Sequence, residues 1–239
     1  MPTKIKGQPP SEEVIAKLKD DGKPVLLSFS CGKDSIAAWI ALEEAGIEVV
    51  PVYMWLVPNL RFIEAELDYF ERMFETRIHR YPHAAFYAYL RNATAQAPER
   101  LSIIEAMDVP RITYDDIWSA IRKDLDMPDA WIADGVRAAD SIVRRVSFVK
   151  YGVMKEKTRK VSPVADWLKA EVMDAISRRG IELPVDYELF GRSFDGLDYR
   201  FVAPLKKHLP EDYATLEQWF PMLEADIVRH GAYGGAADE

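Results

Sequence analysis

The sequence predicts an α/β protein, a three-layer sandwich with a mainly parallel sheet followed by a more helical C-terminal region. In the first half of the chain, short and nearly continuous apolar runs alternate with segments of helical spacing, the pattern of a sheet covered on both faces. A polar turn joins the first run directly to a helical segment, as in a strand–helix–strand unit with a right-handed crossover. The last third carries helical stripes instead of apolar runs.

The first part of the chain, up to Leu56, is expected to form two helices and two strands. Residues 1–22 should form a loose arm and a short helix with Ser11 as its N-cap. Pro24–Phe29 is nearly all apolar and suits a buried strand. The segment from Asp34 has helical spacing and ends at Gly46, a typical C′ glycine. The apolar run Val49–Leu56 is then the second strand.

The later elements are shorter or more helical. Residues 78–81 and 131–133 are expected to be the third and fourth strands. Apolar side chains at helical spacing predict three further helices, the last of them interrupted at Pro221. Their stripes are Ile63, Leu67, Phe70 and Phe74; Leu168, Val172 and Ile176; and Leu216, Trp219, Leu223 and Ile227.

Composition excludes several classes of protein. The 239 residues are 49% hydrophobic and 29% charged, values typical of a globular rather than a disordered chain. No apolar run approaches the ~20 residues that span a bilayer, and the first residues lack the apolar stretch of a secretory signal. The single cysteine, Cys31, permits no internal disulfide, and the four scattered histidines match no zinc or iron–sulfur spacing. We therefore expect a cytoplasmic protein with no membrane partner, no zinc and no iron–sulfur cluster.

The net charge of −8 argues against a general nucleic-acid coat, but the charge is unevenly distributed. Residues 137–160 hold eight basic side chains and two acidic ones, whereas residues 209–239 hold seven acidic side chains and one arginine. A local positive site in an acidic molecule suits a small polyanion.

The most informative segment is Ser28–Ser35, SFSCGKDS, between the first strand and its helix. It fails the Walker A pattern and the dinucleotide glycine pattern. Small residues such as Ser30 and Gly32 nevertheless allow close approach of a ligand, and a helix N-terminus attracts anions. Ser35 and Lys33 add donors, and Asp34 could hold Mg²⁺ or cap the helix. The structural alternative is that Ser30 and Asp34 only cap the helix and Gly32 only makes the turn.

The segment resembles the signature SGGxDS of the PP-loop ATP pyrophosphatases, or adenine nucleotide alpha hydrolases, with Cys31 in place of the first glycine. Two further segments resemble the phosphoadenosine phosphosulfate (PAPS) reductase-like branch: DGVRAADSIVRR at 134–145 and SPVADWLKAEVMDAI at 162–176. The stretch YMWLVPNLRFIEAELDYFE is similar to phage-borne members of that branch. Together the resemblances cover most of residues 24–190 and imply a Rossmann-like fold.

The resemblance implies an adenine nucleotide, ATP or PAPS, bound with Mg²⁺. The loop would bind its phosphates, the end of the second strand would lie beside adenine and ribose, and the arginine-rich segment would face the phosphates. Lys33, Asp34 and Arg137 would act in catalysis, with Asp34 as the metal ligand. The full nucleotide-binding set is Ser28, Ser30, Cys31, Gly32, Lys33, Asp34, Ser35, Tyr53, Met54, Gly135, Arg137, Ser141, Arg144 and Arg145.

The spacing of two arginines agrees in part with the phosphate-binding role that the resemblance implies. Arg137 and Arg144 are seven residues apart, so on one helix they could share a face and clamp an anion. The structural alternative is a solvated basic helix in which Asp140 pairs with Arg144.

The chain departs from the branch because it has no cysteine beyond residue 31. Reduction of a sulfonucleotide by its own thiol is therefore not expected, and Cys31 is interpreted as a small loop residue. The remaining reaction is cleavage of ATP at the α-phosphate, giving pyrophosphate and an adenylylated acceptor. That acceptor could be a nucleic-acid base or a small metabolite. The alternatives are a sulfonucleotide enzyme using an external thiol and a non-catalytic nucleotide-binding protein.

We accordingly expect an N-terminal arm and helix at 1–22, a nucleotide-binding α/β domain at 23–205 and a C-terminal helical extension at 206–239 with a flexible tail from Gly231. These parts would form one structural domain, and a homo-oligomer is compatible with the sequence. His79 and His83 have metal-helix spacing, but the proline between them disfavours a site. The loop residues Tyr187, Arg192, Ser193 and Asp195 fit either a site lining or an ordinary turn.

Overall fold

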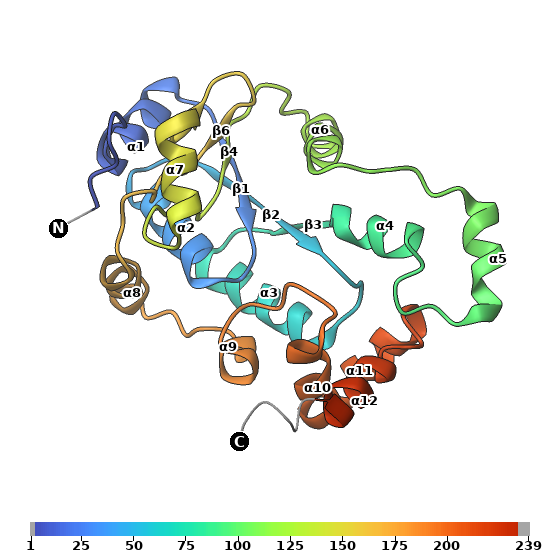
Figure 1. Cartoon of the computed structure of the whole chain (residues 1–239). Helices are drawn as coiled ribbons and strands as arrows, with labels where there is room; N and C mark the ends of the chain where they lie inside the picture. The colour runs from blue at the N-terminus through green and yellow to red at the C-terminus, as the bar shows by residue number, and fades with distance from the viewer. Residues whose placement is uncertain (1–2, 234–239) are drawn as a thin grey trace. The chain divides into compact units, whose positions relative to one another are not determined.

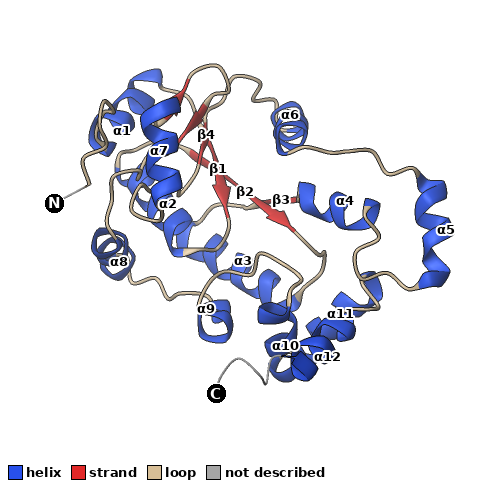
Figure 2. Ribbon diagram, in the orientation of Figure 1, coloured by secondary structure: helices blue, strands red, loops and turns tan. Residues whose placement is uncertain are grey.

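The computed structural model describes residues 3–233 and contains one six-stranded sheet in the strand order β3-β2-β1-β4-β6-β5. The strands β1 (Val25–Phe29), β2 (Val49–Trp55), β4 (Ile132–Ala133) and β6 (Lys160–Val161) pair in parallel, and β5 (Met154–Lys155) pairs antiparallel with β6. β3 is His79–Pro82. The mainly parallel α/β fold predicted from the sequence is confirmed, with the strands drawn in red in Figure 2.

Twelve helices are found within the described residues and are labelled in Figure 1. Those up to β4 are α1 (Ser11–Asp21), α2 (Lys33–Glu44), α3 (Arg61–Phe74), α4 (Ala84–Arg91), α5 (Pro98–Met107) and α6 (Tyr114–Asp124). Those that follow are α7 (Ile142–Tyr151), α8 (Lys169–Arg178), α9 (Val185–Phe190), α10 (Tyr199–His208), α11 (Pro210–Trp219) and α12 (Glu224–Tyr233). After β6 and up to residue 233, every regular element is a helix, which confirms the more helical C-terminal region.

The chain divides into two compact units. Unit 1 contains residues 1–54, 69–81 and 121–184, and unit 2 contains residues 55–68, 82–120 and 185–239. The three-part division expected from the sequence stays a prediction. Helix α12 includes Gly231 to Tyr233, whereas the rest of the expected flexible tail, residues 234–239, lies outside the described residues.

The core of unit 1 forms where the apolar runs and stripes meet. Leu26 and Leu27 of β1 are fully buried, and α2 buries eight consecutive residues from Ser35 to Leu42. The ring of Trp39 stacks on Phe74 with centroids 4.0 Å apart and meets Phe29 edge-on at 5.1 Å. α2 also packs against α8. β1 and α2, whose residues are apolar on nearly every side, are therefore enclosed by other elements of unit 1.

Two local predictions need correction. Ser11 is the first residue of α1 and Pro10 is its N-cap; Ser11 instead donates its backbone N–H to Asp166 Oδ2 at 3.1 Å, and its hydroxyl also donates to that carboxylate. Arg137 lies outside α7, which begins at Ile142. The expected sharing of one helical face by Arg137 and Arg144 is therefore wrong, because the chain between them turns before the helix starts.

Candidate functional site

The two motif segments meet at one place in the sheet. The chain runs outward from β1 through β2 to β3, and then crosses back to β4 on the other side of β1. β1 and β4 are parallel neighbours in register at Leu26 and Ile132, so their carboxyl ends lie at the same edge. Open α/β sheets bind ligands outside the carboxyl ends of strands where the strand order reverses. The segments Ser30–Ser35 and Asp134–Arg137 leave the sheet at this edge.

The Ser30–Ser35 turn is tied together by its two serines. Ser35 Oγ donates to the carbonyl of Gly32 at 2.8 Å and accepts from the N–H of Ser30 at 3.2 Å. The two hydroxyl oxygens are 3.2 Å apart. Since the one proton of the Ser35 hydroxyl goes to Gly32, the Ser30 hydroxyl is the donor between them. The serines therefore shape the turn from inside.

The N-terminus of α2 has no side-chain cap. Gly32 is the N-cap residue, and it makes no side-chain cap hydrogen bond. The alternative in which polar side chains of the turn cap this helix is therefore not what the structure shows. The first N–H groups of a helix need acceptors other than its own carbonyls, and together with the helix dipole they favour an anion.

Cys31 has a left-handed backbone, with φ of 56°, and is buried. This conformation is costly for a residue with a Cβ and is free of strain for glycine. Glycine would suit this backbone best. In this chain a small cysteine side chain occupies the position and is accommodated in the interior.

Gly135 brings the segment after β4 directly onto the first turn of α2. A Cβ at this position would lie 2.4 Å from the carbonyl carbon of Asp34 and 2.6 Å from the backbone nitrogen of Ser35. Those atoms are backbone and cannot rotate away. Only glycine permits this approach, and with it the placement of Arg137 beside α2.

Arg137 is buried, with 4% of its surface exposed, and its guanidinium is surrounded by acceptors. Nε lies 2.8 Å from Asp34 Oδ1, without the alignment of a hydrogen bond. Nη2 donates to Asp140 Oδ1 at 2.6 Å, and Nη1 donates to the carbonyl of Trp167 at 3.3 Å. Arg137 thus joins three segments of unit 1.

The ion pairs continue on both sides of Arg137. Lys33 Nζ lies 2.6 Å from Asp34 Oδ2, and Arg144 Nη1 lies 2.6 Å from Asp140 Oδ2. We call the sequence Lys33, Asp34, Arg137, Asp140 and Arg144 the charge chain. It holds three cations and two carboxylates, so it carries one net positive charge. The expected Asp140–Arg144 pair is present, and Asp140 also binds Arg137.

The other residues expected at the site differ in position. Tyr53 is buried near the end of β2, in register with Phe29 at the end of β1. Ser28 lies within β1 and Met54 within β2, both half-buried. Ser141 is the N-cap of α7 and accepts from the N–H of Arg144 at 3.1 Å. Arg145 is exposed on α7. None of these five residues is part of the charge chain.

Asp134 is a residue that the sequence reasoning did not select. It follows β4 immediately, and its Oδ1 accepts from the Ser162 hydroxyl at 2.6 Å and from the N–H of Val136 at 3.1 Å. Burial raises the pKa of the Asp134 carboxyl, and these two hydrogen bonds oppose the shift. Its position at the carboxyl end of a parallel strand was the available signal.

The side chains around Asp34 suit a metal ion only if the ion binds together with a ligand that supplies further oxygen atoms. Both oxygens of Asp34 face cations, and within residues 3–233 no group of three or more His, Cys, Asp or Glu side chains is arranged to hold a metal. Mg²⁺ commonly keeps one or two carboxylates and takes its other ligands from water and substrate phosphates. The role of Asp34 as a Mg²⁺ ligand stays a prediction, and it requires one ion pair to open.

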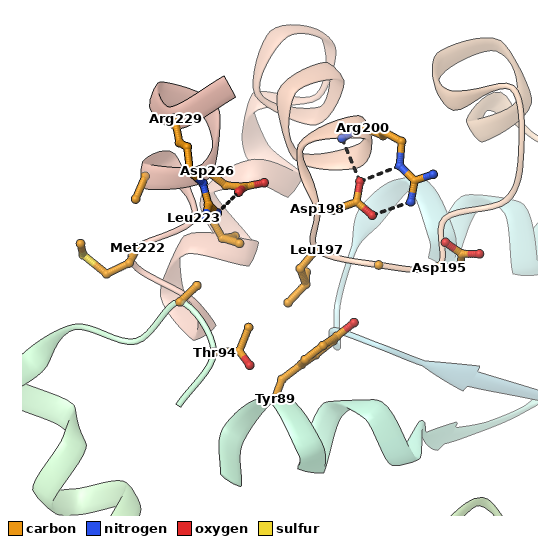
Figure 3. A pocket seen from close by; sticks show the side chains of 13 residues that line it. Tyr89, Thr94, Asp195, Leu197, Asp198, Arg200, Met222, Leu223, Asp226 and Arg229 are labelled. Atoms are coloured by element: carbon orange, nitrogen blue, oxygen red, sulfur yellow. Dashed lines mark hydrogen bonds and ion pairs between the residues drawn. The ribbon is translucent and has the colours of Figure 1, made fainter. Parts of the chain in front are cut away.

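Unit 2 has a separate cavity of about 690 Å³, shown in Figure 3. Tyr89, Leu197 and Leu223 line it, and Asp198 and Asp226 are ion-paired with Arg200 and Arg229 in its wall. Burial, followed by the charges of Asp195 and Asp198, raises the pKa of Tyr89. No residue of the predicted nucleotide site lines this cavity. Asp195, from the loop that fitted either a site or a turn, does line it and pairs with Arg192.

The two histidines with metal-helix spacing do not lie on one helix. His79 is in β3, whereas His83 is the N-cap of α4 and its Nδ1 accepts from the N–H of Ala85 at 3.0 Å. Burial lowers the pKa of His83. In the part of the chain that the structure describes, no helix combines the length and apolarity needed to cross a membrane.

Comparison with known proteins gives little sequence similarity. No protein-family model matches the chain, and no curated protein matches it. Among solved structures it is similar to the NH3-dependent NAD synthetase from Campylobacter jejuni subsp. jejuni NCTC 11168 in complex with the nitrate ion. The identity is 10%, the alignment covers 94% of each chain and the TM-score is 0.45. The fold class of the chain follows from its own strand order and parallel pairing.

Proposed function

We propose that this chain binds an adenine nucleotide at the carboxyl ends of β1 and β4, and that it is a PP-loop ATP pyrophosphatase related to the PAPS reductase-like branch. One observation carries the proposal. The segments Ser30–Ser35 and Asp134–Arg137, which are far apart in the sequence, meet where the strand order reverses, beside the N-terminus of α2, which has no side-chain cap. This combination matches the known placement of phosphate ligands in open α/β sheets.

The charge chain supports an anionic ligand. Asp34 supplies negative charge beside Lys33 and Arg137. We propose that phosphate oxygens replace Asp34 as the partner of the Lys33 ammonium and accept hydrogen bonds from the first N–H groups of α2. Arg137 would keep its contact with Asp140 and so stay in place. A charge-assisted hydrogen bond to phosphate is stronger than a neutral one, which favours the exchange.

The proposed reaction is transfer of the adenylyl group. A nucleophilic oxygen or nitrogen of the acceptor attacks the α-phosphorus of ATP, the bond to the bridging oxygen breaks and pyrophosphate leaves. A second nucleophile then displaces AMP. Such transfers depend on positioning and charge neutralisation, so no covalent protein nucleophile is needed. Bound Mg²⁺ would neutralise phosphate charge. The acceptor in this proposal is a nucleic-acid base or a small metabolite, and the compartment is the cytoplasm.

The test is to measure AMP and pyrophosphate release from α-labelled ATP with a panel of acceptors, together with nucleotide binding by calorimetry. Lys33→Ala should weaken ATP binding by ~10-fold or more, since it removes a charge-assisted contact. Lys17→Ala, which changes an exposed lysine on α1, is the matched control and should bind normally. If ATP does not bind, or binds Lys33→Ala as tightly as the unaltered chain, the proposed site is wrong.

A second candidate is nucleotide binding without turnover. It is favoured by the burial of Arg137 among Asp34, Asp140 and the carbonyl of Trp167, because the two carboxylates already neutralise its guanidinium. ATP would then raise the melting temperature while no AMP forms with any acceptor. Comparison of ATP with PAPS separates both candidates from a sulfonucleotide enzyme, because a 3′-phosphate pocket would favour PAPS.

A further inference from the structure

The cavity of unit 2 is formed by two parts of the chain that are far apart in the sequence (Figure 3). One wall comes from α4 and the loop after it, and the other comes from α12, the start of α10 and the loops before both helices. The N–H of Met222 donates to the carbonyl of Ala95 at 2.9 Å, and the ring of Tyr89 meets Phe220 edge-on at 5.9 Å. These contacts join the two walls. The cavity volume of about 690 Å³ lies within the ~300–1,000 Å³ of small-molecule sites.

Two hydroxyl groups of the cavity wall are available to a ligand. Tyr89 and Thr94 are half-buried, and neither side chain hydrogen-bonds to another residue in the part of the chain that the structure describes. The raised pKa of Tyr89 keeps its hydroxyl protonated at neutral pH, because burial and the charges of Asp195 and Asp198 disfavour the phenolate. The wall therefore presents hydroxyl groups that can donate as well as accept.

Two carboxylates of the wall each keep an unused oxygen. Asp226 accepts from Arg229 through Oδ1, and Asp195 accepts from Arg192 through Oδ2. Among residues 3–233, no hydrogen bond reaches Asp226 Oδ2 or Asp195 Oδ1. Each carboxylate oxygen can accept about two hydrogen bonds. Hydroxyl or N–H groups of a ligand would therefore find acceptors without disturbing either ion pair.

The ion pairs also limit the charge of the ligand. Asp198 Oδ2 lies 2.8 Å from Arg200 Nη2, so each of the three aspartates that line the cavity has an arginine partner on its own segment. A charged ligand would have to compete with one of these partners and break an existing pair. An uncharged hydroxyl group can bond to the remaining oxygens and leave the charges balanced. The cavity therefore favours a neutral ligand rich in hydroxyl groups.

Several other lining residues are apolar and suit a ring. Leu197 and Leu223 are 9% and 2% exposed, and Met222 is 44% exposed. The side chains of Leu197 and Leu223 and the ring of Tyr89 lie around the same space in Figure 3. Apolar surface that a ligand buries against them is removed from water, which stabilises binding. A ligand that combines a ring with several hydroxyl groups matches both parts of the lining.

We propose that the cavity of unit 2 binds an uncharged glycoside, a sugar joined to a planar ring. The unused carboxylate oxygens and the hydroxyls of Tyr89 and Thr94 would bind the sugar, and the apolar residues would bind the ring. Two sources supply this chemistry, a nucleoside and an aryl glycoside. No residue of the proposed nucleotide site lines this cavity, and the proposal does not rest on the proposed function.

Isothermal titration calorimetry with the full chain tests the proposal, using uridine and phenyl β-D-glucoside as probes. We expect at least one of them to bind with a dissociation constant of ~1 mM or lower, and the probe that binds identifies the source of the glycoside. Tyr89→Phe and Thr94→Val keep the side-chain shape and remove one hydroxyl, so each should weaken that binding by ~5-fold. Tyr87→Phe, which removes a hydroxyl from the same helix outside the cavity, is the matched control and should bind normally.

Four results would overturn the proposal. The first is that neither probe binds in this range. The second is binding that Tyr89→Phe or Thr94→Val leaves unchanged, which would place the probe elsewhere. The third is equal affinity for the probe and for its ring alone, uracil or phenol, since the ring lacks the sugar. The fourth is loss of probe binding in Lys33→Ala, which would assign the probe to the nucleotide site. Circular dichroism of each variant checks that the fold is retained.

Discussion

A buried carboxyl pair in unit 2 makes the stability of the protein depend on pH. Glu66 of α3 and Asp186 of α9 are 7% and 1% exposed. Burial, reinforced by the nearby charge of Asp186, raises the pKa of Glu66 to about 9. Burial also raises the pKa of Asp186 to about 6, and the N–H of Phe194, which donates to Asp186 Oδ2 at 2.8 Å, opposes that shift. At neutral pH the folded chain therefore keeps a proton on Glu66 while Asp186 is ionised.

The sign of the pH effect follows from where that proton is bound. The pKa of Glu66 is higher in the folded state than its ordinary 4.5, so its stabilising contribution is complete at low pH and is lost as pH rises toward about 9. Between the ordinary pKa of 4.5 and the folded-state pKa of about 9, each pH unit lowers the free energy of unfolding by ~1.4 kcal/mol. Between about pH 7 and pH 8.5, above the pKa of Asp186, the loss from Glu66 is ~2 kcal/mol.

The perturbation is Glu66→Gln, which preserves the side-chain shape and cannot ionise. Urea unfolding at several pH values in this window should show that most of the ~2 kcal/mol decline disappears in the variant. Glu105→Gln, at an exposed position on α5, is the control and should decline like the unaltered chain. Parallel declines for Glu66→Gln and the unaltered chain would refute the reasoning, because they would show that Glu66 is already ionised in the folded state.

Three further predictions concern the site. Gly135→Ala should lower the free energy of unfolding by ~3 kcal/mol or more, since its Cβ would overlap backbone atoms of α2. Gly196→Ala, whose Cβ would meet nothing closer than 3.6 Å, should lower it little. Equal melting temperatures for the two variants would contradict this prediction. In urea unfolding, Cys31→Gly should change the free energy of unfolding by less than ~1 kcal/mol, because relief of backbone strain at φ 56° offsets the lost burial of the thiol. Cys31→Val should lower that free energy by ~2 kcal/mol or more. Asp140→Asn should lower the free energy of unfolding by ~3 kcal/mol, because it removes one of the two carboxylates that neutralise buried Arg137. Arg144→Ala, at a side chain that is about half exposed, should lower it by under ~1 kcal/mol; similar losses for the two variants in chemical denaturation would contradict this assignment.

Regular elements with strong local patterns were predictable from the sequence. β1, α2 and β2 occur within about two residues of the expected positions, and Gly46 has the left-handed φ of 76° expected after a helix. The signal is local because burial repeats along the chain with the period of the element. β5 and β6 were not predicted, since two-residue strands are too short to show a period.

The interior of the site was less predictable. The sequence indicated Asp34 and Arg137 individually, but no spacing rule relates residues on different strands, and their 2.8 Å contact exists because β1 and β4 are neighbours. Asp140 shows the same limit. Its i, i+4 pairing with Arg144 was foreseen, whereas its contact with Arg137 depends on a turn that the helical spacing argument did not anticipate.

By itself the sequence determined the alternation of buried strands and helices and the chemical character of the SFSCGKDS turn, because both depend on neighbouring residues. Only the tertiary structure decided that Gly135 must contact the first turn of α2 and that Arg137 is enclosed by two carboxylates. Those properties depend on distances between segments remote in the chain, and strand order and packing set those distances.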